Sequence, residues 1–416
     1  MNINSGVFVF VGVFKYDIEY FRKQLKSKLY LENNYYKESR EYFKSKYYPT
    51  WITSVFENLQ SEGTPALLQL DITNTELSEI QLLEINDYER INVYRYRINE
   101  ININRYREDL GIFSIKIELD GNYNFDDISY FCRNFRSINS TIAQNQKSSV
   151  TDIIEKYIIS IFSPEINDWR YYNPNLKVAI FLDIDKKLDT LSQDKLLYRL
   201  GTLTMESEDL FEPSQRYFSD IMETNTIDLF NNWKVLCLYD TFVRIAINLG
   251  SLDKYKIWEN EYLNIYLHVL HARYYLHHIN SKLAKKEINL KESKTIRNNF
   301  ISFMNDFELI KISYKYLPNV LFDKLKKILD VSSEKELIEI KISRINKDLQ
   351  EEADNTLNRI LYFLTLITIV SVAHDGGQLA STFIDADYRG FIHISTSVTL
   401  LVLISSIMLF FRFNKK

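Results

Sequence analysis

The longest apolar runs in the chain lie near its C-terminus. Residues 391–411 read FIHISTSVTLLVLISSIMLFF and contain no Asp, Glu, Lys or Arg, while residues 357–373 contain only Arg359. An α-helix rises about 1.5 Å per residue, so about 20 apolar residues cross a hydrocarbon core of about 30 Å. We therefore predict two C-terminal transmembrane helices. The alternative is a helical hairpin buried in a soluble core.

Basic residues flank the outer ends of these two runs. They are Lys341, Arg344, Lys347 and Arg359 before or at the start of the first run, and Arg412, Lys415 and Lys416 after the second. The connecting residues 374–390 hold one basic residue, Arg389, and three aspartates. Because cytoplasmic flanks are enriched in Lys and Arg, we expect a multi-pass protein of the inner (cytoplasmic) membrane. Both termini would lie in the cytoplasm and the loop outside.

Ahead of the first run, apolar residues recur at the three- and four-residue steps of one helix face. They are Ile338, Ile342, Ile345, Leu349, Ala353, Leu357, Ile360 and Leu364. Pro318 is the only proline between Gly250 and Gly376, and no glycine lies between them. We predict a helical bundle over 191–332 and a stalk helix over 333–373 that continues into the first span. An outer loop at 374–390, a second span at 391–412 and a basic tail at 413–416 would follow.

The N-terminal half alternates short β-like runs with helical patterns. Apolar, β-branched runs occur at 7–14, 66–72, 91–98, 112–119 and 178–183, and helical patterns at 17–29, 76–84 and 150–162. This alternation predicts an α+β cytoplasmic domain over residues 1–190, a mixed sheet with covering helices. Within the bundle we expect helices near 226–249, 254–283, 293–316 and 320–328.

Composition and short motifs argue against several classes of function. The formal net charge is −4, without the basic excess of a nucleic-acid binder, so we expect no direct nucleic-acid partner. Cys132 and Cys237 stand outside any CxxC spacing, which is typical of inert core thiols in a reducing compartment. The chain carries no Walker loop, GxGxxG, HExxH or nucleophile elbow, so we predict that it is not an enzyme.

Polar residues on the first span are spaced to share one side of a helix. Asn355, Asn358, Tyr362 and Thr365 stand at i, i+3, i+7 and i+10, and Thr368 and Ser371 continue that edge. In an oligomer they would form rings of amides and hydroxyls, which are groups that line cation paths, so we expect them to line a pore. The alternative is hydrogen bonding between helices without conduction.

Two further groups carry metal-ligating side chains. His268 and His271 lie three residues apart on one helix stripe, a spacing at which two imidazoles can share a metal. Glu206, Glu208 and Asp209 are clustered oxygen donors of the kind that binds divalent cations. For the histidines a solvated or interface face is the simpler interpretation, and for the acidic residues a solvent-exposed loop.

One pair of arginines is the candidate site for a nucleotide. Arg95 and Arg97 point to one face of a predicted strand, and Tyr94 and Tyr96 point to the other. Arginine beside aromatic rings can hold a nucleotide through phosphate contacts and stacking. An edge strand kept soluble by its charges explains the same pattern, and we favour it.

The order of these elements resembles the CorA family of divalent-cation transporters, and the basic end, Arg412 to Lys416, is similar to that family's tail. The resemblance implies a homo-oligomer, usually a pentamer, with the first span lining the pore. Magnesium-transporting members carry Gly-Met-Asn at the outer end of that span, where this chain has His374 followed by Asp375, Gly376, Gly377 and Gln378. We expect these last four residues to form the outer-mouth filter, in which Gly377 and Gln378 supply a tight turn and a ring of amides.

A branch of the family that lacks this motif accompanies type III CRISPR systems, and its members resemble membrane effectors switched on by a nucleotide messenger. The chain is similar to that branch in its large N-terminal domain and changed filter. We therefore expect a homo-oligomeric channel in the lipid bilayer, gated by its cytoplasmic domain in antiviral defence. One alternative is a divalent metal-ion transporter with an altered filter, and another is a membrane-anchored sensor or enzyme. The expected ligand is accordingly a nucleotide second messenger or a divalent cation, and no cofactor is assigned.

Overall fold

A computed structural model describes most of the chain up to Ser381. The described residues are 3–17, 19–20, 30–32, 38–53, 55, 67–73, 75–87, 90–105, 110–138, 150–162, 169–170, 173–185, 188–206, 212–247, 257–284, 290–309 and 311–381. The chain divides into two compact units, Met1–Glu287 with Lys294–Glu339, and Ile288–Ser293 with Ile340–Lys416. The second span expected at 391–412, the tail at 413–416 and most of the helix expected at 17–29 lie outside the described residues.

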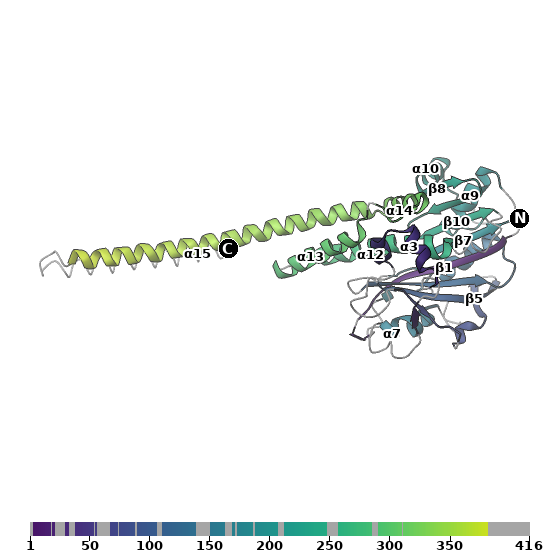
Figure 1. Cartoon of the computed structure of the whole chain (residues 1–416), viewed down its shortest axis with the longest axis horizontal. Helices are drawn as coiled ribbons and strands as arrows, with labels where there is room; N and C mark the ends of the chain where they lie inside the picture. Colours follow the sequence, from purple (N-terminus) through teal and green to yellow (C-terminus); the bar gives the residue numbers. More distant parts are fainter. Residues whose placement is uncertain are drawn as a thin grey trace. The chain divides into compact units, whose positions relative to one another are not determined.

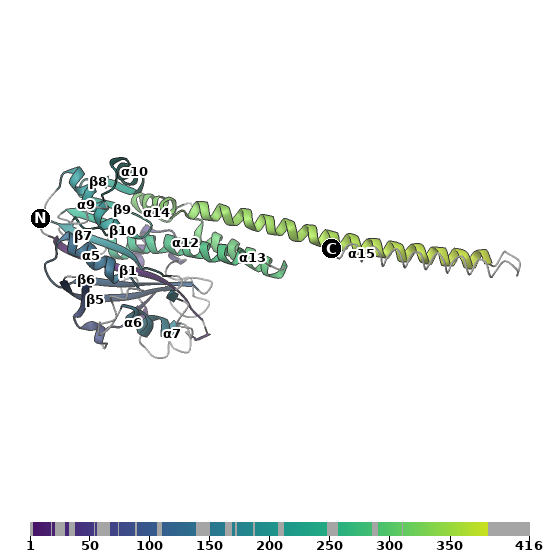
Figure 2. The same ribbon diagram turned by 180° about the vertical axis from the view of Figure 1, so that it is seen from behind.

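A mixed ten-stranded sheet forms the centre of the first unit. Its strands are β1 (Ile3–Lys15), β2 (Tyr30–Glu32), β3 (Leu67–Leu70), β4 (Gln81–Asp87), β5 (Arg90–Arg105), β6 (Leu110–Leu119), β7 (Lys177–Ile184), β8 (Thr226–Phe230), β9 (Trp233–Cys237) and β10 (Thr241–Ile247). Their order is β2-β3-β5-β6-β1-β7-β10-β9-β8, and β4 pairs with the first part of β5. The pair β7–β10 is parallel, and the strands from β5 to β8 lie side by side in this order in Figure 2.

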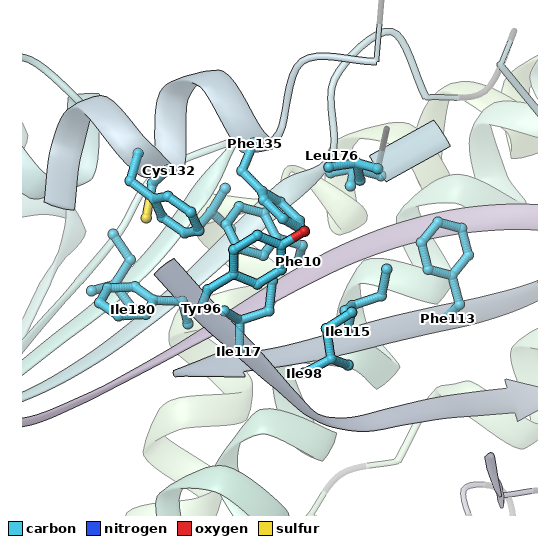
Figure 3. Packing of buried hydrophobic residues seen from close by; sticks show 14 of the residues in the cluster. Phe10, Tyr96, Ile98, Phe113, Ile115, Ile117, Cys132, Phe135, Leu176 and Ile180 are labelled. Atoms are coloured by element: carbon cyan, nitrogen blue, oxygen red, sulfur yellow. The ribbon is translucent and has the colours of Figure 1, made fainter. Parts of the chain in front are cut away.

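Helices cover one face of the sheet over its largest apolar cluster. They are α5 (Phe125–Phe135), α6, η6 and α7 (Val150–Ile154, Glu155–Ile159, Ser160–Phe162), α9 (Thr190–Thr202) and α10 (Gln215–Asn225). Asn124 and Asp127 begin α5 with a reciprocal capping box. The ring of Phe135 then lies 4.3 Å from that of Phe10 and 5.4 Å from that of Tyr96 (Figure 3).

A second set of helices packs on the opposite face. It comprises α3 (Arg40–Lys46), α4 (Pro49–Ile52), the π-helix η8 (Trp258–Tyr262) and α12 (Leu263–Leu283). Phe242 of β10 stacks on Tyr266 of α12 with 4.9 Å between ring centres. Because both faces are covered, β1 is buried from Val7 to Phe14 and β7 is buried throughout.

Three further helices complete the described chain. They are α13 (Leu290–Phe307), α14 (Tyr316–Ile328) and α15 (Val331–Ser381). A left-handed residue, Asp330 with φ of 52°, separates α14 from α15. The 51 residues of α15 form one uninterrupted helix of about 76 Å at 1.5 Å per residue (Figure 1). The predicted stalk helix is therefore present, but it is longer than expected at both ends.

The structure confirms the five predicted strands and corrects three other expectations. Residues 226–249 do not form a helix, because they carry β8, β9 and β10. Residues 76–84 form the short 3-10 helix η4 (Glu76–Ser78) followed by β4. The sheet consequently extends to Ile247, so the expected boundary at residue 190 is too early and the helical bundle does not begin at residue 191.

Candidate functional site

The apolar segment of α15 is exposed. Over the part of the chain that the structure describes, Val331–Gly376 is the one helix long and apolar enough to cross a membrane by length and composition, with a best-window mean hydropathy of 1.6. Nothing in that window is buried. Leu357, Leu361, Leu364 and Val372 are each more than half exposed. A core helix of a soluble protein would pass the same test of composition but would be mostly buried.

The six residues expected to line a pore all lie on this segment, and all are exposed. They are Asn355, Asn358, Tyr362, Thr365, Thr368 and Ser371. The Thr365 hydroxyl donates to the Leu361 carbonyl at 2.8 Å, and the Thr368 hydroxyl donates to the Leu364 carbonyl at 2.9 Å. Since each hydroxyl proton is used within the helix, the oxygen presents lone pairs outward, as a cation ligand must.

The structure corrects the expected backbone conformation at the outer end of the first span. Residues Asp375, Gly376, Gly377 and Gln378 belong to α15, which continues to Ser381, so the predicted tight turn and the loop over 374–381 are wrong. The Gln378 amide lies 3.2 Å from the His374 ring, one helical turn earlier. Gly121 is the one described glycine with a positive φ, so the backbone at Gly376 needs no glycine. Residues 382–390 lie outside the described residues.

Of the two alternatives for this face of α12, the solvated one is wrong, because His268 and His271 are both 3% exposed. The His268 ring lies 5.0 Å from Phe307, and the His271 ring lies 5.8 Å from Phe303. Burial lowers the pKa of His268 to about 3 and the pKa of His271 well below its ordinary value. Both imidazoles are therefore neutral at physiological pH. Among the described residues, no group of three or more His, Cys, Asp and Glu side chains could hold a metal.

The acidic residues expected near Glu206 are only partly described. The Glu206 carboxylate pairs with Arg199 of α9 at 3.0 Å, and its side chain is 74% exposed. Glu208 and Asp209 lie outside the described residues. A cavity of about 320 Å³ adjoins Glu206 and is lined by residues that include Lys195, Tyr198, Arg199, Glu212 and Phe218. The cavity carries two cations and two carboxylates, so its charges balance.

The arginine pair on β5 is placed as predicted on one face, but not on an edge strand. Arg95 and Arg97 lie 3.1 Å and 3.8 Å from the Asp120 carboxylate, with their side chains more than half exposed. Tyr94 and Tyr96 are buried on the opposite face. The edge interpretation is wrong, because β4 pairs with β5 on one side of this stretch and β6 pairs on the other.

A buried polar seam between the sheet and η8–α12 escaped the sequence analysis. The Tyr47 hydroxyl donates to the Glu261 carboxylate at 2.9 Å, and Lys116 of β6 pairs with Glu259. Burial raises the pKa of both carboxyl groups. These carboxylates lie on the π-helix η8, and π-helical turns are frequent at functional sites. Such pairing between distant segments leaves no local signal in the sequence.

A second group that sequence analysis missed lies where β7, β10, α5 and α12 meet, and we call it the Asp240 cluster. It comprises Arg136, Lys177, Tyr239, Asp240 and Arg273. Lys177 pairs with the Asp240 carboxylate, and the Arg136 guanidinium lies 3.6 Å from it. Arg273 and Lys177 both lie against the Tyr239 ring, with 3.9 Å and 4.2 Å to its centre.

Burial in the Asp240 cluster lowers the pKa of Lys177. The Lys177 side chain is 10% exposed and that of Arg136 is 19% exposed. Desolvation lowers the pKa of Lys177, Asp240 raises it, and Arg273 and Arg136 lower it further. The net direction is downward, because desolvation of the buried ammonium is the largest of these effects.

The chain matches no protein-family model, no curated protein and no solved structure.

Proposed function

We propose that the chain is a subunit of a homo-oligomeric membrane channel that resembles the CorA family, with α15 as its pore-lining helix. The observation that carries the proposal is the exposed apolar segment of α15, in which Leu357, Leu361 and Leu364 are each more than half exposed. A segment this apolar is unstable in water, so lipid and neighbouring subunits would have to cover it.

The polar residues of the same segment favour a pore over a simple anchor. An anchor needs only apolar side chains, whereas Thr365 and Thr368 present oxygen lone pairs outward. In this proposal, gating depends on the continuous helix α15, which joins the sheet-containing unit to the apolar segment. The helix begins at Val331 in the unit that holds the sheet and continues through the apolar segment, so a ligand bound in that unit acts on the pore through one helix.

The fuller form of the proposal keeps the second span at 391–412 and a nucleotide messenger as the activating ligand in antiviral defence. Both rest on the sequence and on the resemblance to the family. A divalent metal-ion transporter and a membrane-anchored sensor or enzyme remain the alternatives that the following experiment separates from a gated channel.

The test is ion flux through the full chain reconstituted in liposomes, with K⁺ and Mg²⁺ measured separately. Replacing both threonines, T365L/T368L, should reduce flux about ten-fold or more, because it removes the oxygen ligands from the path. The matched control is F363L/I367L. Each of these positions is two residues from Thr365, about 200° around the helix, and should face away from the path.

The outcomes distinguish the alternatives. Flux of Mg²⁺ alone would favour the transporter. No flux from the parent chain, with or without nucleotides, would favour an anchor. Equal loss in the control variant would contradict a specific role for the two threonines.

A further inference from the structure

The Asp240 cluster carries more positive charge than the protein itself neutralises. Arg136 follows α5, Lys177 begins β7 and Arg273 lies on α12, so segments far apart in sequence bring three cations together. Among the described residues, Asp240 is the one carboxylate that pairs with Arg136 and Lys177, whereas Arg273 contacts the Tyr239 ring and hydroxyl. The cluster thus has a formal charge of about +2 in a partly desolvated position, where unpaired charge is costly.

The donors of the cluster are only partly used within the protein. Arg136 lies 3.6 Å from Asp240, which is too long for a hydrogen bond. Arg273 donates from Nε to the Tyr239 hydroxyl at 3.1 Å and from Nη1 to the Leu329 carbonyl. A guanidinium has five N–H donors, so both arginines retain donors for a further acceptor. Tyr239, whose ring contacts both Lys177 and Arg273, is 51% exposed, so a ligand can reach this part of the cluster from solvent.

We infer that the Asp240 cluster binds a soluble phosphate-bearing ligand, held by Arg136, Lys177 and Arg273. Arginine forks bind phosphate through paired hydrogen bonds, a lysine ammonium binds it as a point charge, and a phosphate dianion matches the excess charge. The balanced charges around the cavity beside α9 make that cavity a weaker candidate for an anion.

The Asp240 cluster lies beside the start of α15, so a ligand bound there could affect that helix. Leu329, which accepts from Arg273, immediately precedes Asp330 and the start of α15. A phosphate competing for the Arg273 guanidinium changes its bond to that junction. This second step rests on the proposed channel function, whereas ligand binding itself does not.

Isothermal titration of the full chain in detergent with pyrophosphate, at constant ionic strength in NaCl, tests the inference. We expect saturable binding of one ligand per chain. Both R273Q and R136Q should weaken it about ten- to hundred-fold, as expected for a lost charge-assisted hydrogen bond. The matched control, K195Q, removes a cation beside the α9 cavity and should leave affinity unchanged.

A gain of affinity distinguishes the inference from simple misfolding. D240N removes the competing carboxylate and should tighten binding about two- to ten-fold, which a damaged protein would not do. Absent binding in the parent chain, unchanged binding in R273Q and R136Q, or weakening by K195Q would overturn the proposed site.

Two further experiments address separate questions. The first asks whether the phosphate belongs to a soluble ligand or to a lipid headgroup, and the second asks whether ligand binding changes ion flux through the proposed pore. Titration with dihexanoyl phosphatidic acid identifies a lipid headgroup, and binding of that lipid without pyrophosphate binding would overturn a soluble ligand. Ion flux in liposomes with and without pyrophosphate tests coupling to α15. Intact binding without any flux would contradict the channel proposal and leave the binding site in place.

Discussion

At the scale of single residues, the polar stripe of α12 shows where sequence patterns mislead. His268 and His271 fall on a stripe with Glu261 and Asn264, which indicates an outward face. The structure buries all four residues, since sheet and helices surround α12. A stripe of polar residues predicts which residues share a side, but it does not predict what packs against that side.

The buried histidines make stability depend on pH. Above about pH 6.5 both the folded and the unfolded chain hold neutral imidazoles. Below it the unfolded chain binds protons that the folded chain excludes, down to the pKa of His268 near 3. The free energy of unfolding should therefore fall on acidification from pH 6.5 by up to about 1.4 kcal/mol per pH unit for each buried histidine. Thermal unfolding of the full chain in detergent between pH 7.5 and 5.0 measures the effect.

Replacement of one histidine should flatten that dependence. H268F keeps an aromatic ring beside Phe307 and Phe322 and removes one titrating group. Its slope of stability against pH should be smaller than that of the parent by up to about 1.4 kcal/mol per pH unit below pH 6.5, whatever the change in absolute stability. H277Q, at an exposed position on the same helix, is the control and should keep the parental slope. An H268F slope equal to the parent's would contradict the assignment.

At the scale of elements, the apolar pattern predicts β1, β3, β5, β6 and β7. It does not predict β8, β9 and β10, which form one end of the sheet. β1 and β7 are continuous apolar runs bounded by polar residues. In contrast, β8, β9 and β10 lie within one apolar stretch interrupted only by short turns, at 231–232 and 238–240. A buried parallel strand such as β10 has no alternation, so periodicity does not separate it from a buried helix.

The glycines near the end of the first span do not end the helix, although glycine commonly follows a helix C-terminus. Gly376 and Gly377 indicated a helix end, yet α15 passes through both to Ser381. A glycine inside a helix costs about 1 kcal/mol relative to alanine, which a long helix tolerates. The candidate pore residues were nevertheless placed correctly on one helix, because long apolar periodicity is the strongest signal in the chain.

The continuity of α15 can be measured directly as a distance. Spin labels at S333C and N355C span 22 residues, which corresponds to about 33 Å in an unbroken helix. Both positions are exposed, and they lie on either side of the division between the two compact units. Pulsed electron resonance on labelled chains diluted with unlabelled chains should give one narrow distance distribution. A broad distribution would contradict a continuous helix.

A proline variant serves as a control that should interrupt the helix between the two labels. K347P places a proline in the helix interior between the labels, where it removes a backbone hydrogen bond and clashes with the preceding turn. The distance should broaden or shorten in K347P. It should stay unchanged in K347A, because the Lys347–Glu351 pair is long, at 3.9 Å, and exposed.

At the scale of the whole molecule, the part of a single chain that the structure describes leaves the apolar segment of α15 without cover. Lipid can cover apolar side chains, but Asn355 and Asn358 have amide groups that hydrocarbon does not satisfy. The proposed homo-oligomer would resolve this, since polar sides of neighbouring α15 helices would face a shared aqueous path or one another. Such an assembly would suit both kinds of side chain in a membrane.

Cysteine cross-linking tests this assembly without altering the native thiols. Cys132 and Cys237 are fully buried, and burial raises the pKa of both. Since the thiolate is the reactive form, the parent chain should not cross-link when membranes are treated with copper phenanthroline. T365C should give disulfide-linked dimers on a non-reducing gel, because residue 365 of adjacent subunits would face a common axis.

The control position decides what such dimers mean. Phe363 lies about 200° around the helix from Thr365, so F363C should face lipid or another element and cross-link far less. Random collisions in the membrane would link both variants equally, and a monomeric anchor would link neither at low expression. Strong linkage of T365C with weak linkage of F363C requires one side of α15 to face its own copies. That is the geometry on which a pore lined by Thr365 and Thr368 depends.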